Sequence, residues 1–384
     1  MYIKRKLTSK LKQSAKEFPV VAVIGPRQSG KTTLVKNTFP GYKYISLENP
    51  DTREFAKNDP KNFLNNYNNG VIIDEAQRVP DLFSYIQGIV DEDKKPGQFI
   101  LTGSQNFLLH NKINQSLAGR VSILKLLPLS LEELSSIDND YEYYLYNGFY
   151  PKLYDSKISP NDWHNSYIQT YIERDIRQLK NITDLNTFQK FIKMCANRTG
   201  QILNLSSLAN DCGISHNTAK SWISILEASF IIFLLEPHYK NFNKRLIKSP
   251  KLYFYDVGLV SNLLNIENKD QIIHFRLKGE LFETFVIAEL MKNRFNEGQK
   301  NNNYFWRDKT GNEIDCLIET ANNITPIEIK SGKTITSDYF KNINYWNKLS
   351  KNRPGQSYVV YGGNENQKRK QGNIISWNSL ESIN

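Results

Sequence analysis

The sequence predicts an α/β protein whose first third folds as a parallel, doubly wound sheet. Short apolar segments alternate there with stretches long enough for a helix, which is the pattern of such a sheet. A glycine-rich loop follows the first apolar segment, and two adjacent carboxylates follow the third. The expected strands are Val20–Ile24, Tyr42–Ile45, Val71–Ile73, Phe99–Thr102 and Ser122–Leu126. At 384 residues the chain is too long for one compact core, so we expect further domains.

The composition indicates a globular, basic protein. The apolar fraction of 39% is ample for globular folding, and the formal net charge of +11 favours a polyanionic partner. A Lys- and Asn-rich composition also gives basic surfaces without such a partner. The cysteines, Cys195, Cys212 and Cys316, form no zinc spacing, which indicates free thiols in a reducing compartment. Because no apolar run approaches the ~18–20 residues of a membrane span, we expect a cytoplasmic protein that does not interact with membranes.

A phosphate-binding loop is the most specific motif. Gly25–Thr32 reads Gly-Pro-Arg-Gln-Ser-Gly-Lys-Thr and lies between an apolar strand and a helix expected over Thr32–Asn37, the context that GxxxxGK[ST] requires. Glycines let successive N–H groups point at phosphate, and the helix N-terminus adds its positive dipole end. Lys31 is expected to reach the β- and γ-phosphates, and the Thr32 hydroxyl to bind Mg²⁺. The predicted ATP-binding residues are Gly25, Pro26, Arg27, Gln28, Ser29, Gly30, Lys31, Thr32 and Thr33.

Two carboxylates supply the second half of this site. Asp74 and Glu75 end the buried segment that begins at Gly70, and open α/β sheets bind ligands at the carboxyl ends of their strands. We expect Asp74 to hold Mg²⁺ and Glu75 to orient or deprotonate the attacking water. An ordinary turn after a strand is the alternative interpretation of the pair. The motifs together predict a P-loop ATPase.

Residues 1–135 resemble the AAA+ ATPases, in particular the AAA_14-like proteins in which this core is fused to a DUF4143-type, nuclease-like domain. The segments that carry the resemblance are Asp74–Gln77, Leu101–Gln105 and Ser116–Arg120. The resemblance implies an AAA+ ATPase core over residues 1–135.

Further site residues follow from this resemblance. It implies a polar sensor group at the end of the segment Leu101–Gln105, with Ser104 or Gln105 as the candidate. It also implies that Arg120 is an arginine finger, which stabilises charge on the transferring phosphoryl group. A surface arginine bound to a carboxylate is the alternative interpretation of Arg120. A finger that acts between subunits would make the active form a homo-oligomer.

The middle of the chain predicts a helical connector over residues 136–198 and a winged-helix-like module over 199–257. Leu205–Ala209 and Ser215–Glu227 form the expected helix–turn–helix, with Ser215 as N-cap. Lys220 then faces outward on the helix that meets base edges in DNA-binding members. The loop between the expected wing strands has a local excess of basic residues suited to phosphate, namely Lys240, Lys244, Arg245, Lys248 and Lys251. Winged helices also serve as lids and protein-contact modules.

A set of charged residues marks the C-terminal part. Pro326–Lys330 is an expected strand, so Glu328 and Lys330 share one face, and Asp315 lies on a neighbouring strand. Glu283 has apolar neighbours at helical spacing, and such an inward carboxylate must be paired or bound to metal. Oxygen ligands with a lysine suit Mg²⁺-assisted phosphodiester hydrolysis. We therefore expect a catalytic role for Lys330 and metal ligands at Glu283, Asp315 and Glu328.

The C-terminal arrangement resembles the PD-(D/E)xK nuclease fold, which implies a nuclease-like domain over residues 258–384. Trp306–Asp308 and Gly311–Asp315 also match the domain fused to this ATPase branch. One departure is that Glu313-Ile-Asp315 replaces a Pro-Asp pair. The alternative is a degenerate nuclease fold whose acids and lysine form a buried salt-bridge network.

The main hypothesis is an AAA+ ATPase that acts on nucleic acid, DNA in particular, with ATP and Mg²⁺ as cofactors and a metal-dependent nuclease-like domain. The rival hypothesis is an ATP-driven switch whose degenerate nuclease-like domain only recognises DNA or a protein partner. A third hypothesis is a toxin-related or defence protein that is activated by its nucleotide state. The sequence does not distinguish this hypothesis from the other two.

Overall fold

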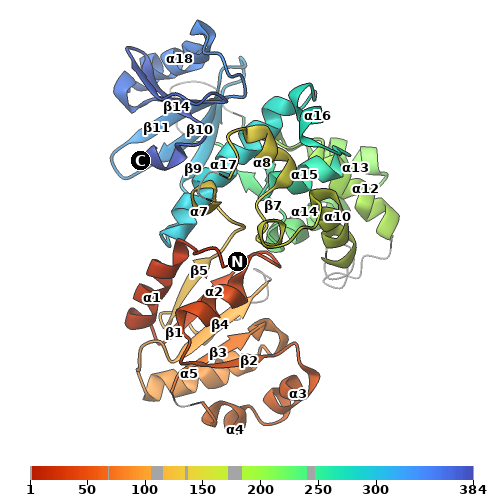
Figure 1. Ribbon diagram of the computed structural model, residues 1–384, viewed down its shortest axis with the longest axis vertical. Coiled ribbons are helices and arrows are strands. Elements are labelled where there is room, and N and C mark those ends of the chain that lie inside the picture. Colours follow the sequence, from red (N-terminus) through yellow and green to blue (C-terminus); the bar gives the residue numbers. More distant parts are fainter. Residues whose placement is uncertain are drawn as a thin grey trace. The chain divides into compact units, whose positions relative to one another are not determined.

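The computed structural model describes residues 2–67, 69–104, 116–134, 137–171, 184–239 and 247–383 (Figure 1). The chain forms two compact units. Unit 1 comprises Met1–Leu129, Ala228–Phe230 and Arg294–Lys300. Unit 2 comprises Ser130–Glu227, Ile231–Asn293 and Asn301–Asn384. Nearly all of the expected ATPase core therefore lies in unit 1, and most of the three segments expected after it lies in unit 2.

Unit 1 is built on a five-stranded sheet in the order β2-β3-β4-β1-β5, with every neighbouring pair parallel. Strand β1 is buried along its whole length, as expected for a parallel sheet covered on both faces. The predicted α/β class and its parallel sheet are confirmed. The strands are β1 Val20–Ile24, β2 Lys43–Ser46, β3 Val71–Asp74, β4 Phe99–Gly103 and β5 Val121–Lys125.

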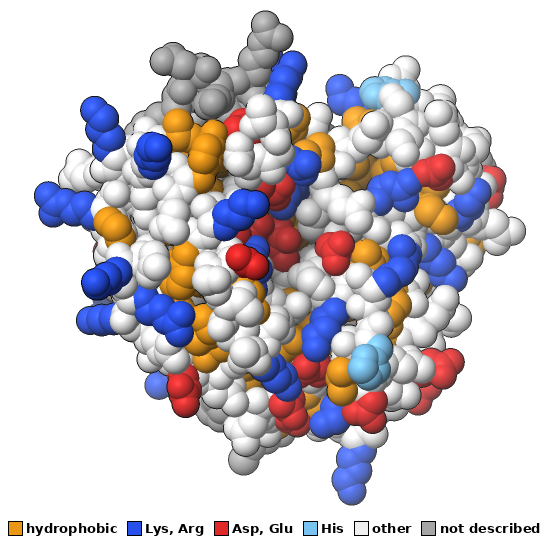
Figure 2. Space-filling model, turned by 90° about the horizontal axis from the view of Figure 1, so that it is seen from above, with side chains coloured by type: hydrophobic (Ala, Val, Ile, Leu, Met, Phe, Trp, Pro, Cys, Tyr) orange, Lys and Arg blue, Asp and Glu red, His pale blue; other side chains and the backbone are white. Residues whose placement is uncertain are grey.

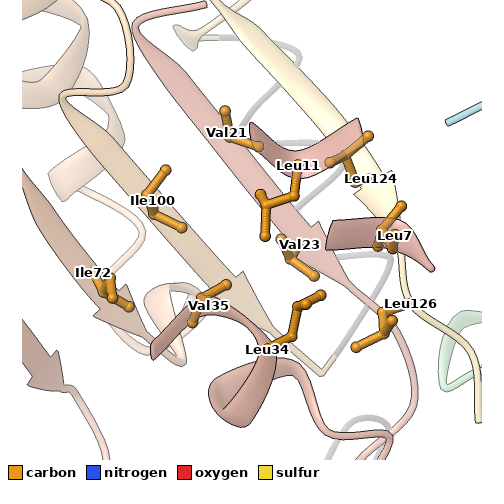
Figure 3. Close-up of a cluster of buried hydrophobic side chains, with 10 residues drawn as sticks. All are labelled: Leu7, Leu11, Val21, Val23, Leu34, Val35, Ile72, Ile100, Leu124 and Leu126. Carbon is orange, nitrogen blue, oxygen red and sulfur yellow. The ribbon is translucent and has the colours of Figure 1, made fainter. Parts of the chain in front are cut away.

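Two helices of unit 1 pack on one face of this sheet. Figure 3 shows side chains from α1 (Leu7–Glu17) and α2 (Lys31–Thr38) directed at alternate residues of β1, Val21 and Val23. Ile72, Ile100 and Leu124 of the neighbouring strands complete this cluster. The cluster anchors α2, and with it the loop between β1 and α2. The remaining helices in the described part of unit 1 are α3 Pro50–Asn58, α4 Pro60–Asn65, η1 Ala76–Arg78 and α5 Leu82–Glu92.

The first half of unit 2 is helical and ends in a small antiparallel sheet of order β6-β8-β7. The sheet is formed by β6 (Gln201–Ile202), β7 (Ile232–Leu235) and β8 (Lys251–Phe254), and β6 was not anticipated from the sequence. The helices are α7 Leu131–Leu134, α8 Tyr141–Asn147, α9 Lys152–Asp155, α10 Pro160–Tyr167, α12 Leu185–Ala196, α13 Leu205–Cys212, α14 His216–Ala228, α15 Val257–Leu263 and α16 Lys269–Ile273.

The second half of unit 2 contains a six-stranded mixed sheet in the order β13-β14-β12-β11-β10-β9. Strands β9 to β11 pair antiparallel, and β11, β12 and β14 pair parallel. Trp346 of the helix that follows β11 packs against Trp306, Ile314 and Leu317. The elements are α17 Lys278–Asn296, β9 Asn303–Arg307, β10 Glu313–Glu319, β11 Ile324–Lys330, η3 Ser337–Phe340, α18 Lys341–Ser350, η4 Pro354–Gln356, β12 Tyr358–Tyr361, β13 Gln367–Arg369, β14 Gly372–Ser376 and η5 Leu380–Ser382.

Two expectations from the composition concern free cysteine thiols and membrane spans. Cys195, Cys212 and Cys316 are free and buried, and burial raises the pKa of each thiol above its ordinary value. Such thiols react slowly because the thiolate is the nucleophile. Among the helices in the described ranges, none combines the length and the apolar character that crossing a membrane requires.

Candidate functional site

The phosphate-binding loop connects the carboxyl end of β1 to the N-terminus of α2. Gln28 and Gly30 adopt left-handed backbone conformations, with φ of 62° and 92°. No side chain in the described part of the chain caps the first turn of α2. Gly25 must remain without a side chain, because a Cβ there would lie 2.0 Å from the Leu126 carbonyl oxygen. The loop thus has the curled backbone and open helix N-terminus that suit an anion.

An arginine that the sequence motif does not contain braces this loop. Arg5 is only 4% exposed, and its guanidinium donates to the carbonyl oxygens of Ser29 and Leu127, each at 2.7 Å. Leu127 lies just beyond β5, so Arg5 connects the loop to the chain that leaves the neighbouring strand. Arg5 lies before α1 and belongs to no motif, so the sequence gives little indication of its role.

Lys31 is buried within the loop that it is expected to serve. Its Nζ donates to the carbonyl oxygens of Gly25 at 3.0 Å and Pro26 at 2.7 Å. Burial lowers the pKa of Lys31 to about 8, the carboxylates of Glu75 and Asp74 oppose this shift, and the positive charge of Arg27 adds to it. The ammonium therefore lies close to both predicted carboxylates, while Thr33, the last residue of the predicted set, is exposed on α2.

Asp74 lies at the end of β3 among three hydroxyl donors. Thr32 Oγ1 is 3.1 Å from both of its carboxylate oxygens, Tyr44 donates to Oδ2 at 2.8 Å, and Thr102 donates to Oδ1. Burial and the hydrogen bond to Asp74 raise the pKa of Tyr44 to about 12. The Thr32 hydroxyl and the Asp74 carboxylate thus form a set of hard oxygen ligands, which fits Mg²⁺.

Tyr44 and Thr102 were missed by the sequence reasoning. Ser46 lies beside Asp74 in the β2–β3 register, so Tyr44, two residues earlier, is on the same face of the sheet. Thr102 is on β4, the neighbour of β3 on its other side. Alternate residues of a strand share one face of a sheet, so both residues could be found from Asp74 if the neighbours of β3 were known. The sequence does not provide this strand order.

Glu75 begins the turn after β3 in a left-handed conformation, with φ of 55°. Its Oε2 accepts hydrogen bonds from Ser104 Oγ at 3.1 Å and from the Gln77 side chain. The structure therefore places the predicted sensor residue Ser104 against Glu75, whereas Gln105 lies outside the described residues. Strained backbone of this kind is frequent at functional sites, and here it turns the Glu75 carboxylate toward Ser104.

Arg120 lies at the opposite edge of the sheet from the loop. Its backbone oxygen accepts from Val20 N at the start of β1, whereas the loop follows the end of β1. The five residues of β1 separate the two positions by about 16 Å at ~3.3 Å per residue. The guanidinium forms a two-point ion pair with Asp91 on α5. Arg120 therefore does not reach the nucleotide site of its own chain, and the finger prediction remains only for action between subunits.

The C-terminal residues lie on the strands that the sequence predicted. Lys330 Nζ is 2.8 Å from Glu328 Oε2 and 3.4 Å from Asp315 Oδ2, and Asp315 also accepts from Ile329 N at 2.8 Å. Glu328 is 1% exposed, and burial, reinforced by the charge of Asp315, raises the pKa of Glu328 to about 8. Its Oε1 has no hydrogen-bond partner among the described residues. Glu328, Lys330 and Asp315 thus form a single charged group at β10 and β11.

Glu283 is bound by a lysine, which corrects part of the sequence interpretation. Lys251 Nζ is 2.9 Å from Glu283 Oε1 and also pairs with Glu313, and Tyr253 donates to Glu283. Lys251 was predicted to contact nucleic-acid phosphate from the loop between the wing strands. This prediction is wrong, because Lys251 is 3% exposed, begins β8 and points inward. Burial raises the pKa of Glu283 to about 7.

The metal prediction for the C-terminal part is not matched by a ligand cluster. Within residues 2–383 as far as they are described, the structure assembles no group of three or more His, Cys, Asp or Glu side chains that could hold a metal ion. Lysines pair with the three predicted ligands: Lys251 binds Glu283, and Lys330 binds Asp315 and Glu328.

The expected nucleic-acid residues are only partly described. Ser215 caps α14, because its hydroxyl accepts a hydrogen bond from Thr218 N at 3.0 Å. Lys220 on this helix is exposed, and so is Lys248. Lys240, Lys244 and Arg245 lie outside the described residues. On the face drawn in Figure 2, lysine and arginine side chains intermingle with acidic ones, which gather near its centre. The net positive charge thus forms no continuous basic surface across the described part of this face.

Comparison with protein families defines the class. Residues 17–135 match AAA_14, described as an AAA domain, so this chain carries a P-loop domain of the AAA ATPase type. Residues 138–270 match DUF8612 and residues 278–380 match DUF4143, both described as domains of unknown function. The match to DUF4143 agrees with the resemblance seen in the sequence, and its description assigns no activity.

Two mycobacterial relatives identify the family. The uncharacterized protein Rv2008c of Mycobacterium tuberculosis and the uncharacterized protein Mb2031c of Mycobacterium bovis are each 31% identical to this chain over 337 residues. The match covers 86% of this chain and 74% of each relative. The chain belongs to the family of these two proteins.

Solved structures with weaker similarity include a Walker-type ATPase and a DnaA protein bound to AMPPCP. The Walker-type ATPase PABY2304 of Pyrococcus abyssi is 15% identical, with a TM-score of 0.45 over 68% of this chain and 96% of that chain. AMPPCP-bound DnaA from Aquifex aeolicus is 16% identical, with a TM-score of 0.30 over 58% of this chain and 85% of that chain.

Proposed function

We propose that unit 1 binds ATP with Mg²⁺ and hydrolyses ATP to ADP and phosphate. The observation that carries this proposal is the convergence of Lys31, Thr32, Asp74 and Glu75 at the carboxyl edge of one parallel sheet. The match of residues 17–135 to an AAA domain supports it.

Each residue has a task that follows from its position. The backbone of the loop and the Lys31 ammonium bind the phosphates, and the Thr32 hydroxyl and the Asp74 carboxylate are the residues that would hold Mg²⁺. When bound, Mg²⁺ neutralises phosphate charge and orients the phosphates. Ser104 and Gln77 fix the Glu75 carboxylate, which is then placed to orient a water molecule or accept its proton.

Two variants test this assignment. Lys31→Ala should abolish ATP binding, because it removes the charge that faces the phosphates. Glu75→Gln should retain ATP binding and lower turnover about 100-fold or more, since it removes only the catalytic carboxylate. Nucleotide titration and phosphate release measured on both variants and on wild type separate the two roles. Equal loss of affinity in both variants would contradict the role given to Glu75.

We also propose that unit 2 contacts nucleic acid, DNA in particular, through a winged-helix-like module. The order helix, strand, two helices and two strands from α12 to β8 supports this proposal, as do the exposed Lys220 and Lys248. For the nuclease-like part, formed by α17, β9 to β12 and α18, we favour recognition over cleavage. The observation behind this choice is that lysines bind the carboxylates of Glu283, Asp315 and Glu328.

A cleavage assay decides between recognition and cutting. The full chain is incubated with Mg²⁺ or Mn²⁺, ATP and labelled single-stranded, duplex and branched DNA, and binding and cutting are measured in the same samples. Retention of DNA without cutting is expected. Metal-dependent cutting that Lys330→Ala abolishes would establish the nuclease hypothesis instead.

A further inference from the structure

Two arginines beside the phosphate-binding loop converge on one carboxylate oxygen. Arg27 is the third residue of the loop, and Arg78 ends η1, which begins directly after Glu75. The Glu48 Oε1 atom is 3.5 Å from an Arg27 nitrogen and 3.4 Å from an Arg78 nitrogen. All three side chains are accessible, with 38%, 40% and 48% of their surface exposed for Arg27, Arg78 and Glu48.

Glu48 holds these arginines weakly. Both separations are longer than the ~2.7–2.9 Å of a strong charge-assisted hydrogen bond. Ion pairs between exposed side chains contribute little to stability, since water screens the charges. One carboxylate facing two guanidinium groups also leaves these three side chains with a net positive charge. An anion that approaches this group can therefore replace Glu48 as a partner at little cost.

Arg27 is the arginine placed to meet such an anion. It belongs to the loop whose backbone suits phosphate, and its charge acts on the Lys31 ammonium, which is the group that reaches the β- and γ-phosphates. Arg78 comes from the other side of the site, after the catalytic turn. Once Arg27 leaves Glu48, Arg78 still neutralises that carboxylate, so Glu48 does not repel an incoming phosphate.

We propose that Arg27 exchanges Glu48 for the γ-phosphate of ATP and thereby makes the site prefer the triphosphate over ADP. This inference rests on the proposed ATPase function. Glu48 is one resting counter-ion of Arg27, and this contact is released when ATP binds. Because Glu48 lies just beyond β2 and precedes α3, this release gives the β2–α3 segment a different set of partners with ATP and with ADP.

The affinities for two nucleotides test the exchange. The full chain is titrated with Mg²⁺ and either ADP or a non-hydrolysable ATP analogue, and calorimetry gives both dissociation constants. Arg27→Ala should weaken the analogue about tenfold, the loss expected for one charge-assisted hydrogen bond, and change ADP affinity little. Glu48→Gln should tighten the analogue a few-fold, because Arg27 no longer has to leave a carboxylate. Lys43→Ala is the matched control, since it removes an exposed positive charge at the opposite edge of the same sheet.

The outcomes separate this inference from the function on which it rests. If wild type binds neither nucleotide, the proposed ATPase function fails and the inference fails with it. If wild type binds both and Arg27→Ala weakens both equally or neither, only the exchange is overturned. Arg27 is accessible, so its variant should fold; thermal unfolding of each variant checks this.

Discussion

At the scale of single residues, Asp74 depends on hydroxyl groups that three different elements direct at its carboxylate. Tyr44, Thr102 and Thr32 direct their hydroxyls at one carboxylate, and each comes from a different element of unit 1. These donors fix the orientation of the carboxylate. The geometry of the proposed Mg²⁺ site is therefore set by the sheet around it as much as by Asp74 itself.

Tyr44→Phe should weaken the binding of Mg²⁺, so that ATP turnover needs a higher Mg²⁺ concentration. Without the hydroxyl, one Asp74 oxygen loses a donor, and the carboxylate is held in place less firmly. We expect the Mg²⁺ concentration for half-maximal turnover to rise by about 3- to 10-fold, with smaller change in maximal turnover. Steady-state ATPase assays across Mg²⁺ concentrations measure this. Tyr42→Phe, a neighbouring tyrosine whose ring stacks on Phe39, is the control, and an equal shift in both variants would rule out the role of Tyr44.

Lys251→Met should destabilise unit 2. Lys251 is 3% exposed and binds Glu283 and Glu313, and removal of one partner from a buried ion pair leaves uncompensated charge. We expect a loss of about 3–5 kcal/mol in the free energy of unfolding. All five tryptophans, Trp163, Trp222, Trp306, Trp346 and Trp377, belong to unit 2, so tryptophan fluorescence during urea unfolding follows this unit.

The control for Lys251 lies three residues away. Lys248→Met removes the same charge and adds the same side chain at an exposed position. It should change the free energy of unfolding by less than about 0.5 kcal/mol. If the two variants unfold at the same urea concentration, the buried ion pairs do not stabilise unit 2.

At the scale of elements, sequence patterns predicted unit 1 well because its strands are short, largely apolar runs, of which β1, β3 and β4 are buried throughout. β1 has the predicted bounds, β3 and β4 are one residue longer at the carboxyl end, and β2 and β5 are shifted by one residue. Sequence patterns did not predict elements that are very short, or residues whose partners lie far away in the sequence. β6 has only two residues, so it has no detectable alternation.

Lys251 shows the same limit in another form. In sequence it closes a run of basic residues, which favoured a phosphate contact. In the structure it is the first residue of β8 and faces carboxylates from α17 and β10. Neither partner is near Lys251 in the sequence, so charge patterning alone could not distinguish a buried lysine from an exposed one.

The proposed DNA binding by the module of α13, α14, β7 and β8 should depend on salt. Lys220 and Lys248 are exposed, and each lysine that contacts phosphate releases about one condensed counter-ion. The double change Lys220→Gln and Lys248→Gln should reduce the slope of log K against log salt concentration by about two. Fluorescence anisotropy with duplex DNA at several salt concentrations measures the slope. An unchanged slope would mean that neither lysine contacts DNA, and that the module serves as a lid or a protein contact.

At the scale of the whole molecule, the position of Arg120 decides how the ATPase could be completed. It lies at the amino edge of the sheet, about 16 Å along β1 from its own loop, and it is paired with Asp91. An arginine finger at this place can act only on the nucleotide of a second subunit. A finger at this position would link catalysis to assembly, because an isolated chain would have no finger at its own nucleotide.

Arg120→Ala should therefore lower ATP turnover by about 100-fold or more while changing ATP affinity little. Mixing this variant with Lys31→Ala should restore part of the turnover, because the first protein has an intact loop and the second has an intact Arg120. Phosphate release from the mixture and from each variant alone measures this, and Asp91→Ala, which frees Arg120 from its partner, should not lower turnover. Unchanged turnover in Arg120→Ala alone would show that Arg120 is a surface residue bound to Asp91 and nothing more. A loss of turnover that mixing does not restore would mean that Arg120 supports its own subunit, which its place at the far edge of the sheet argues against.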